Sequence, residues 1–519
     1  MLNWYLWTFH FVFTQTNASL LNIIEIFFSK MVRSILRVIW AVSKDELNNN
    51  MLKNIRQFNS EPVVFTKKRK ALICVDNSQM MPEFNTCILG SGWAGLLVAN
   101  RITEIGIKGI ALIEASESGE LGGLLRTEEI DGFTFDCGGP HLLFSRDERV
   151  LSEIIELLKP NYSKRFRNNF VFYNGQFIPY PFENGVYQLN PEERVKLIKG
   201  IIDRMLYISK NGEWKPKNFL EWITGFFGEQ MANEYLIPYN EKIWKRPLDK
   251  MAADWVFSPG RLPFPELENM LLTVAGIPNT GYKEQAYFYY PNTGGIASLF
   301  NSLHERLSEK GMEIITREKV LSVKINSDHT FNINNKLIAN KLISTIPLPE
   351  LLMSLDDGNN YEELAGKFDY NSVVVVGVAI KGKTPNHTSV YVPDSRIIFH
   401  RYTWMSSLMS PKNHDNSNLI AEVTVPKDEK IDLDKIVKEV INGLLDIGVI
   451  KDESSILFTR VWLNRYGYPI YSLDHNEVRE ETMKILEKYG INSVGRWGSW
   501  HYWNTDMVYK AVSNGEWGV

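Results

Sequence analysis

The chain has 519 residues, which is more than one compact core usually holds, so two or three domains are expected. Hydrophobic residues make up 44% and charged residues 23%, as in soluble globular proteins, and a formal net charge of −4 gives no support for a nucleic-acid partner. Cys74, Cys87 and Cys137 are too few for a disulfide scaffold and have no metal-ligand spacing, so the composition predicts a cytoplasmic protein without a metal site.

The first 80 residues differ in composition from the rest of the chain. Residues 1–14 are mostly apolar and aromatic, and within 20–41 the polar residues recur every three or four positions, as on one face of a helix. This pattern resembles an interfacial amphipathic helix more than a membrane span, and the segment has no basic n-region or small-residue cleavage site of a signal peptide. Two interpretations stay open: residues 1–42 make a peripheral contact with a membrane surface, or residues 1–80 form an extension outside the core. Met80 and Met81, which directly precede the first core strand, favour the second.

From Phe84 onward the chain has the pattern of an α/β protein. A short strand at 86–89 leads into a glycine-rich turn, a helix that ends near Glu104, and a second apolar strand at 109–113. Helical periodicity follows at 149–158 and 191–206. Strands are expected again near 287–290, and alternating or β-branched runs predict strands at 320–325, 341–345 and 373–380.

The turn after the first strand reads Gly90-Ser91-Gly92-Trp93-Ala94-Gly95, the G-x-G-x-x-G pattern of a dinucleotide site. Gly90 permits the tight turn, Gly92 lets a pyrophosphate approach the backbone, and Gly95 lets helix and strand pack closely. The helix N-terminus then offers unpaired N–H groups to the phosphates. Glu114 ends the second strand about 20 residues later, where a carboxylate can accept the ribose hydroxyls.

NAD and FAD both use such a unit, and the motifs that follow favour FAD. The run Leu121–Thr127 resembles the second glycine motif of the glutathione-reductase-like flavoproteins, and Asp136–His141 resembles the loop that lies along their isoalloxazine ring. The pair Gly495-Arg496 resembles the segment that closes the FAD site. The resemblance implies FAD contacts from these motifs at Gly122, Gly123, Leu124, Arg126, Gly138, Gly139, Gly495 and Arg496.

The predicted fold is therefore α/β, with a Rossmann-type FAD-binding domain, an inserted helical domain and a β-sheet substrate domain. The FAD-binding part spans 81–150 and is completed by 285–350 and 490–519. Residues 151–284 form a mainly helical substrate or flap domain, and residues 351–489 form a sheet-containing substrate domain.

Further motifs, in the family's order across residues 84–510, resemble the eukaryotic-type UDP-galactopyranose mutases. They are Gly175–Asn184, Pro238–Trp244, Asp254-Trp255 with the following Arg261, Tyr391–Asp394, Phe399–Tyr402, Gly467–Pro469 and Gly495–Tyr502. Three features depart from the family: the spacing from Trp255 to Arg261 is slightly longer, Glu183 stands where Gln is common, and the flavin loop reads Gly-Gly-Pro-His. The last family helix also looks shortened after Asn504.

This resemblance implies a UDP-sugar as substrate. Arg261 and Arg401 would clamp its diphosphate, since the guanidinium fork stays charged and binds oxyanions bidentately. Together with His141 of the flavin loop, these two arginines are the expected catalytic residues. The expected substrate-binding residues are Arg167, Tyr180, Phe182, Glu183, Asn240, Trp244, Gln285, Tyr391, Tyr468, Tyr502 and Asn504.

The implied reaction interconverts UDP-galactopyranose and UDP-galactofuranose, with N5 of reduced FAD as the nucleophile and NAD(P)H as the reductant of the flavin. An oxidase of the amine-oxidase or protoporphyrinogen-oxidase type is the alternative, because it shares the fold and every FAD motif. A third reading is a membrane-surface flavoprotein scaffold that binds FAD without turnover. The oligomeric state stays open.

Overall fold

The computed structural model describes residues 81–212, 214–257, 265–279, 286–310, 312–409 and 415–515. The N-terminal extension, with its expected membrane-surface helix, lies outside the described residues, as do Arg261 and Gln285. Among the described residues, no helix has the length and apolar composition that crossing a bilayer requires.

The N-proximal βαβ unit forms the centre of the first sheet. Strand β1 (Glu83–Leu89) pairs in parallel with β2 (Ile110–Ile113) and with β12 (Leu337–Ser344), and helix α3 (Trp93–Glu104) connects β1 to β2. The sheet has eight strands in the order β13-β10-β11-β12-β1-β2-β9, with β19 also paired to β12. The remaining strands are β9 (Glu313–Ile315), β10 (Val323–Ile325), β11 (Phe331–Ile333), β13 (Leu355–Asp356) and β19 (Ile491–Ser493).

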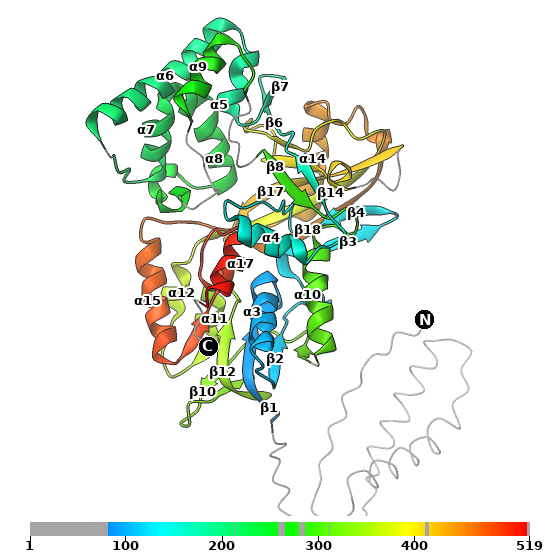
Figure 1. Cartoon of the computed structure of the whole chain (residues 1–519), viewed down its shortest axis with the longest axis vertical. Coiled ribbons are helices and arrows are strands. Elements are labelled where there is room, and N and C mark those ends of the chain that lie inside the picture. The colour runs from blue at the N-terminus through cyan, green and yellow to red at the C-terminus, as the bar shows by residue number, and fades with distance from the viewer. Residues whose placement is uncertain are drawn as a thin grey trace, which may run out of the picture. The chain divides into compact units, whose positions relative to one another are not determined.

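Helices cover both faces of this sheet (Figure 1). Successive residues of a strand point to opposite faces, and both faces of β1 are buried: Ile88 packs in one core cluster, and Cys87 and Leu89 pack in another. The first cluster includes α3, α10 (Ala297–Glu309) and α17 (Thr505–Ser513), and the second includes α11 (Leu348–Ser354), α12 (Glu362–Gly366) and α15 (His475–Lys488). This arrangement confirms the predicted α/β class.

A second sheet of seven strands has the order β18-β14-β17-β16-β15-β6-β7. Strand β14 (Tyr370–Lys381), which lies between β18 and β17, is buried along almost its whole length, and helix α14 (Leu433–Asp446) shares a core cluster with one face. The other strands are β6 (Phe170–Tyr173), β7 (Gln176–Pro179), β15 (Ser389–Tyr391), β16 (Arg401–Trp404), β17 (Asn416–Pro426) and β18 (Ile456–Pro469). Strands β6 and β7 lie within the range expected to be mainly helical, yet they extend this sheet through the pairing of β6 with β15.

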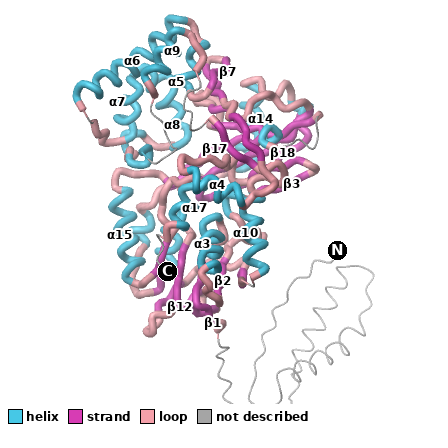
Figure 2. Tube along the Cα trace, viewed as in Figure 1, coloured by secondary structure: helices cyan, strands magenta, loops and turns pink. Residues whose placement is uncertain are grey.

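Between β7 and β8 (Tyr287–Tyr290) the chain forms a helical unit, shown in Figure 2 as the group of helices around α6 and α7. Its core contains three fully or almost fully buried tryptophans, Trp222, Trp244 and Trp255. The helices are α5 (Phe182–Gly185), α6 (Pro191–Asn211), α7 (Phe219–Met231), α8 (Ile237–Trp244) and α9 (Leu267–Ala275). Pro191 at the first position of α6 and Asn190 as its N-cap explain why this long helix starts there.

One predicted strand is shorter than its pattern suggested. The run 320–325 alternates like a strand, but only β10 (Val323–Ile325) joins the sheet. The backbone N–H groups of Leu321 and Ser322 donate instead to the side-chain oxygen of Asn334, at 2.8 and 3.0 Å. The Asn334 side chain therefore accepts from the N–H groups that would otherwise bond to a neighbouring strand.

Asp136 joins three elements at the centre of the molecule. It ends β4 (Phe133–Asp136), which pairs with β3 (Thr127–Ile130), and its side chain is fully buried. The carboxylate accepts hydrogen bonds from the Tyr290 hydroxyl on β8, from the Ile296 N–H at 3.1 Å before α10, and from the Thr127 hydroxyl at 2.8 Å on β3. Burial raises the pKa of Asp136 to about 6, although these hydrogen bonds act to lower it.

We expect Asp136→Ala to lower the free energy of unfolding by about 3 kcal/mol or more, because buried donors of Tyr290 and Ile296 lose their acceptor. Asp136→Asn should cost less, since an amide oxygen still accepts. Urea unfolding at pH 7 measures both losses.

Because Asp136 can be protonated or ionised, the free energy of unfolding of the wild type should also depend on pH. The folded pKa of about 6 lies above the ordinary 3.8, so the stability that Asp136 contributes is complete below pH 3.8 and is lost as the pH rises through 6. Asn at this position stays neutral throughout. The stability deficit of Asp136→Asn should therefore narrow from pH 4 to pH 7, and a deficit that widens would contradict this account.

Candidate functional site

The glycines of the first motif have the geometry that a phosphate-binding turn needs. Gly90 has φ +93°, and a Cβ on it would lie 2.8 Å from the Thr345 hydroxyl. A Cβ on Gly95 would lie 1.9 Å from the carbonyl oxygen of Gly90, so the helix and the strand end touch through backbone alone. A Cβ on Gly92 would meet nothing within 4 Å. The turn is therefore packed on its inner side and open at Gly92.

The start of α3 is suited to an anionic ligand. Gly92 is its N-cap and carries no side chain to cap the first-turn N–H groups. The helix has no acidic residue in its first turn. Unpaired N–H groups and the positive end of the helix dipole thus meet the open space over Gly92, which fits the diphosphate of a dinucleotide.

Glu114 is held in place beside this turn. One carboxylate oxygen accepts from the Ser91 hydroxyl and from the Ser91 N–H at 3.2 Å, and the other accepts from the Ser116 N–H at 2.7 Å. The side chain remains partly exposed. Each carboxylate oxygen has acceptor capacity beyond these bonds, so the expected contact with ribose hydroxyls fits this geometry.

The second glycine motif lies against the first. Gly92 and Gly122 form a parallel β-bridge, and a Cβ on Gly123 would come within 3.3 Å of the Gly92 Cα. Gly122, at φ +101°, passes so close to the Phe300 ring that a Cβ there would lie 2.5 Å from it. The Arg126 side chain donates to the Gly123 carbonyl at 3.0 Å and to Glu120 at 3.1 Å. Both glycine motifs therefore lie next to Gly92, at the start of α3.

The expected flavin loop continues from this point. A Cβ on Gly138 would lie 2.1 Å from the carbonyl oxygen of Leu124, so only glycine lets the two backbones approach. The ring of His141 lies with Nδ1 2.9 Å from the Gly139 carbonyl oxygen. Because a carbonyl only accepts, Nδ1 carries the proton and Nε2 keeps a lone pair. Burial and the charge of Arg496 lower the pKa of His141 to about 4, so the imidazole is neutral at pH 7.

The C-terminal segment meets the same region. A Cβ on Gly495, at φ +95°, would lie 2.5 Å from the Ala94 Cβ on α3. Arg496, in the short helix α16 (Gly495–Gly498), donates to the carbonyls of Trp503 at 2.9 Å and Gly467 at 2.7 Å. Its guanidinium lies 4.6 Å from the ring centre of Tyr502. The closing segment thus places an arginine between the FAD motifs and two of the predicted substrate tyrosines, Tyr468 and Tyr502.

Arg401 forms a bidentate ion pair that sequence reasoning missed. It stands directly opposite Glu422 in the pairing of β16 with β17, and its Nε and Nη2 donate to the two Glu422 oxygens at 2.7 and 2.8 Å. Burial acts to lower the pKa of Arg401, but the carboxylate raises it well above its ordinary value. Glu422 is 1% exposed, and a Cβ on Gly139 would lie 3.0 Å from its Oε2. A single acid within the apolar run Leu419–Val425 is the signal that could have identified it.

Three arginines interact electrostatically with the flavin loop or with one another. Arg401 and Arg496 both act to lower the pKa of His141, and Arg401 acts in the same way on Arg167, whose pKa is lowered chiefly by burial. Arg167 also lies 4.7 Å from the ring centre of Phe144. Glu422 accepts hydrogen bonds from Arg401 and, at 3.4 Å, from the Tyr468 hydroxyl. Fixed guanidinium groups in such a cluster are suited to an anionic ligand.

Aromatic side chains form two walls beside this cluster. In the first, Tyr391 lies between Tyr180, with ring centres 4.7 Å apart, and Tyr239, at 5.8 Å. The second wall consists of Trp244, Trp255, Tyr468 and Tyr502, with neighbouring ring centres 5.0 to 6.0 Å apart. Flat rings with directed hydroxyl groups at this spacing suit a base or a sugar.

Some of the predicted substrate-binding residues form hydrogen bonds or packing contacts within the protein. Asn240 accepts from the Trp244 indole N–H at 3.1 Å and donates to the Leu236 carbonyl at 2.7 Å. Phe182 is fully buried against Tyr235, which places it behind the first wall. Glu183 is also buried and acts electrostatically on Tyr180. Asn504 is the N-cap residue of α17, without a side-chain capping bond.

Comparison with known proteins agrees with this geometry. The family model for flavin-containing amine oxidoreductases matches residues 93–507, so the chain belongs to this family, which binds FAD. The fold is similar to that of reduced UDP-galactopyranose mutase, with 25% sequence identity and a TM-score of 0.74 over 82% of this chain and 93% of that chain.

Two further solved structures share the fold. One is a provisionally assigned protoporphyrinogen oxidase from Exiguobacterium sp. 255-15, with 19% identity and a TM-score of 0.63 over 84% of this chain and 98% of that chain. The other is a CLA-producing fatty acid isomerase from P. acnes, with 14% identity and a TM-score of 0.59 over 84% and 99%. At these identities the likeness concerns the fold alone.

The open side of Gly92 predicts a selective effect on cofactor binding. Gly92→Ala should leave the apo protein as stable as the wild type, because the new methyl group meets no protein atom and φ is −71°. It should weaken FAD binding by about tenfold or more, since the methyl group lies where the diphosphate approaches the backbone. Titration of apo protein with FAD, followed by flavin fluorescence, measures the affinity.

Gly366→Ala is the matched control, because its Cβ also meets nothing within 4 Å and lies in α12, outside the glycine motifs. Equal FAD affinities of the Gly92→Ala and Gly366→Ala proteins would place the diphosphate elsewhere.

Proposed function

We propose that this flavin-containing amine oxidoreductase family member interconverts UDP-galactopyranose and UDP-galactofuranose. The observation that carries the proposal is the cluster of Arg167, Arg401 and Arg496 around the flavin loop, next to walls of tyrosine and tryptophan. A nucleotide diphosphate needs fixed cations, and its base and sugar need flat rings and hydroxyl donors. The sequence motifs and the similarity to a reduced UDP-galactopyranose mutase support the same substrate class.

The glycine motifs and α3 would hold FAD through its diphosphate, with Glu114 at the ribose. Reduced flavin, when bound, would supply the nucleophile at N5, so no serine or cysteine nucleophile is required. NAD(P)H is the proposed reductant. The protein side chains then bind, orient and neutralise charge.

Arg401 would do the central part of that work. Its Nε and Nη2 are occupied by Glu422, which fixes the plane of the guanidinium and directs the remaining Nη1. A guanidinium held in this way needs little reorganisation when the leaving diphosphate gains charge. Neutral His141, with its lone pair on Nε2, adds an acceptor without adding a third positive charge beside Arg401 and Arg496.

The alternative is an oxidase of apolar amines or porphyrin-like substrates. Neither kind of substrate carries a diphosphate, the group that fixed guanidinium groups bind bidentately. The arginine cluster therefore favours the mutase. Conversion of UDP-galactopyranose by dithionite-reduced protein, with UDP-galactofuranose separated by chromatography, tests the proposal directly. A protein that oxidises amines and leaves UDP-galactopyranose unchanged would refute it.

Substitution of Arg401 tests the clamp. Arg401→Ala should keep the flavin spectrum and weaken UDP-galactose binding by about 2–5 kcal/mol, the usual loss when one partner of a desolvated charge pair is removed. It also leaves Glu422 buried without its cation, which affects folding. Arg401→Lys avoids that, because it keeps the charge and loses only the fork, and should weaken binding by about tenfold.

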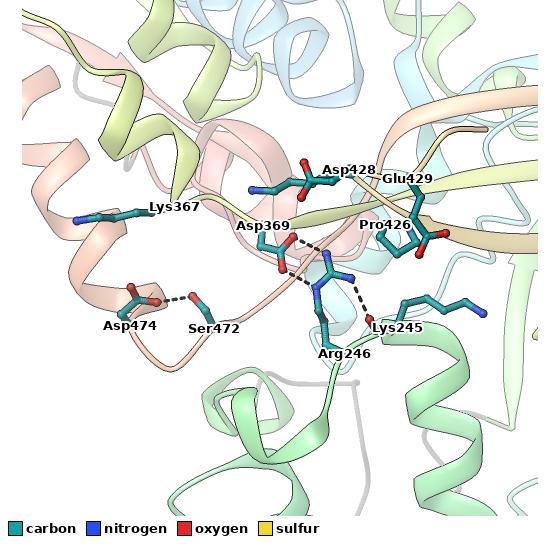
Figure 3. A pocket seen from close by; sticks show the side chains of 10 residues that line it. Lys245, Arg246, Lys367, Asp369, Pro426, Asp428, Glu429, Ser472 and Asp474 are labelled. Atoms are coloured by element: carbon teal, nitrogen blue, oxygen red, sulfur yellow. Dashed lines mark hydrogen bonds and ion pairs between the residues drawn. The ribbon is translucent and has the colours of Figure 1, made fainter.

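Arg246→Lys is the matched control. Arg246 forms the same bidentate pair, with Asp369, at 2.8 and 2.7 Å, beside a surface pocket that contains none of the predicted site residues (Figure 3). Calorimetric titration with UDP-galactose should show an effect at Arg401 and none at Arg246. Equal affinities in Arg401→Lys, Arg246→Lys and the wild type would remove Arg401 from the clamp.

A further inference from the structure

The last turn of α8 is attached to the second sheet by polar side chains. The final carbonyls of a helix have no partner within it. Here the Lys242 carbonyl accepts from the Thr424 hydroxyl at 3.1 Å, and the carbonyls of Ile243 and Trp244 accept from the Asn371 amide at 3.0 and 2.8 Å. Thr424 and Asn371 are buried on β17 and β14. The helix that carries Asn240 and Trp244 thus ends on the sheet that carries Glu422.

The side chain of Lys242 makes a second attachment from the same turn. It is 7% exposed, and its ammonium donates to the carbonyls of Val392 at 2.8 Å and Asp394 at 2.7 Å. Neither acceptor is a carboxylate. Burying an ammonium among neutral acceptors costs folding free energy, which a methionine of the same length would avoid. A residue retained at that cost suggests a role besides stability.

The loop held by Lys242 carries two members of the proposed site. It joins β15 to β16, so Tyr391 directly precedes Val392 and Arg401 opens the returning strand. Tyr391 and Arg401 face each other in the register of this pair, and the Val392 N–H donates to the His400 carbonyl at 2.9 Å. A shift of the loop relative to α8 would therefore move Tyr391 and Arg401 relative to Trp244.

We propose that Lys242 is a positioning residue that fixes the Tyr391–Arg401 hairpin at a set distance from α8. The first aromatic wall, which contains Tyr391, and Arg401 then keep the positions relative to the second wall, which contains Trp244, that a UDP-sugar requires. This role rests on the proposed function for its consequence, and on the geometry of the apo chain for its existence. Lys242 itself contacts no predicted ligand position.

The proposed role has a pH signature. Burial lowers the pKa of Lys242 to about 7; Lys245 lowers it further and Asp394 raises it. Of the titratable groups that face it, His400 is neutral because its pKa lies well below 6.5, and Asp394 is ionised because its pKa lies below 3.8. The pKa of Lys245 is itself lowered from 10.5 by burial. As the pH rises through 7, Lys242 loses its charge and its hydrogen bonds to the loop weaken.

The contribution of Lys242 to global stability rises with pH, while its hydrogen bonds to the loop weaken. The folded pKa of Lys242 lies below the ordinary 10.5, so the unfolded chain binds the extra proton between pH 7 and 10.5, and the contribution of this group to stability rises with pH. Deprotonation of Lys242 therefore does not promote unfolding, and a loss of ligand affinity that depends on Lys242 above pH 7 reports the local attachment.

The test uses the FAD-bound full chain with Lys242→Met, and Lys427→Met as the matched control. Lys427 also joins two backbone carbonyls, those of Gly366 and Phe368 at 2.9 and 3.0 Å, and neither belongs to the predicted site. Hydrogen–deuterium exchange needs no substrate. Faster exchange of the peptide covering 389–401 in Lys242→Met, and not in Lys427→Met, is expected. Unchanged exchange there, or the same acceleration in both variants, would overturn the positioning role.

Calorimetric titration with UDP-galactose then measures the consequence. We expect Lys242→Met to bind about tenfold more weakly than the wild type at pH 6.5, with Lys427→Met unchanged. At pH 8.5 the wild-type affinity should fall toward that of Lys242→Met, whose own affinity should change less. A wild type that binds UDP-galactose, with equal affinity in Lys242→Met and the same pH profile, would overturn the inference. A wild type that fails to bind would refute the proposed function, and the exchange experiment would still decide the role of Lys242.

Discussion

The site depends on the buried carboxylate of Glu422. It lies in the middle of an apolar strand, pairs with Arg401 through both oxygens, and comes so close to Gly139 that a side chain there would touch it. One acid thus joins the second sheet to the loop expected beside the flavin ring. The arrangement requires glycine on the loop, arginine on the neighbouring strand and burial of both charges together, because either charge alone would be costly in this position.

Charge and burial also explain why the site is arranged as it is. Arg401 and Arg496 act to lower the pKa of His141 in the flavin loop, and Glu422 pairs with Arg401. Fixed guanidinium groups of this kind favour an anionic ligand, which is the class of ligand that we propose. The aromatic walls add flat surfaces whose hydroxyl and indole groups can be directed without adding charge.

The polar attachments between parts of the fold follow one rule. Each provides a hydrogen-bond partner for backbone groups at the end of a helix or in a loop. Asn371 and Thr424 donate to the last carbonyls of α8, and Lys242 donates to carbonyls of the loop after β15. Asp136 accepts from the N–H of Ile296 before α10. Apolar packing could hold the same elements together, but it would fix their relative positions less closely. Hydrogen bonds have a preferred length and direction, and this is why we propose that the attachment through Lys242 helps to set the separation of the two aromatic walls.

The local motifs could be predicted from the sequence because each is a short-range steric requirement. Gly90, Gly92 and Gly95 are needed where a strand turns into a helix over a phosphate, and the order of strand, turn, helix and acid specifies the parallel sheet. The strands expected at the aromatic run 287–290 and the β-branched run 373–380 likewise lie close to their observed bounds. Other features depend on contacts between residues distant in sequence. Only the tertiary structure placed Glu422 opposite Arg401, added β6 and β7 to the second sheet and shortened β10 through Asn334. The reason is that a hydrogen-bond donor or a charge has no preferred partner in sequence, whereas a glycine or an alternating strand meets its constraint within a few residues.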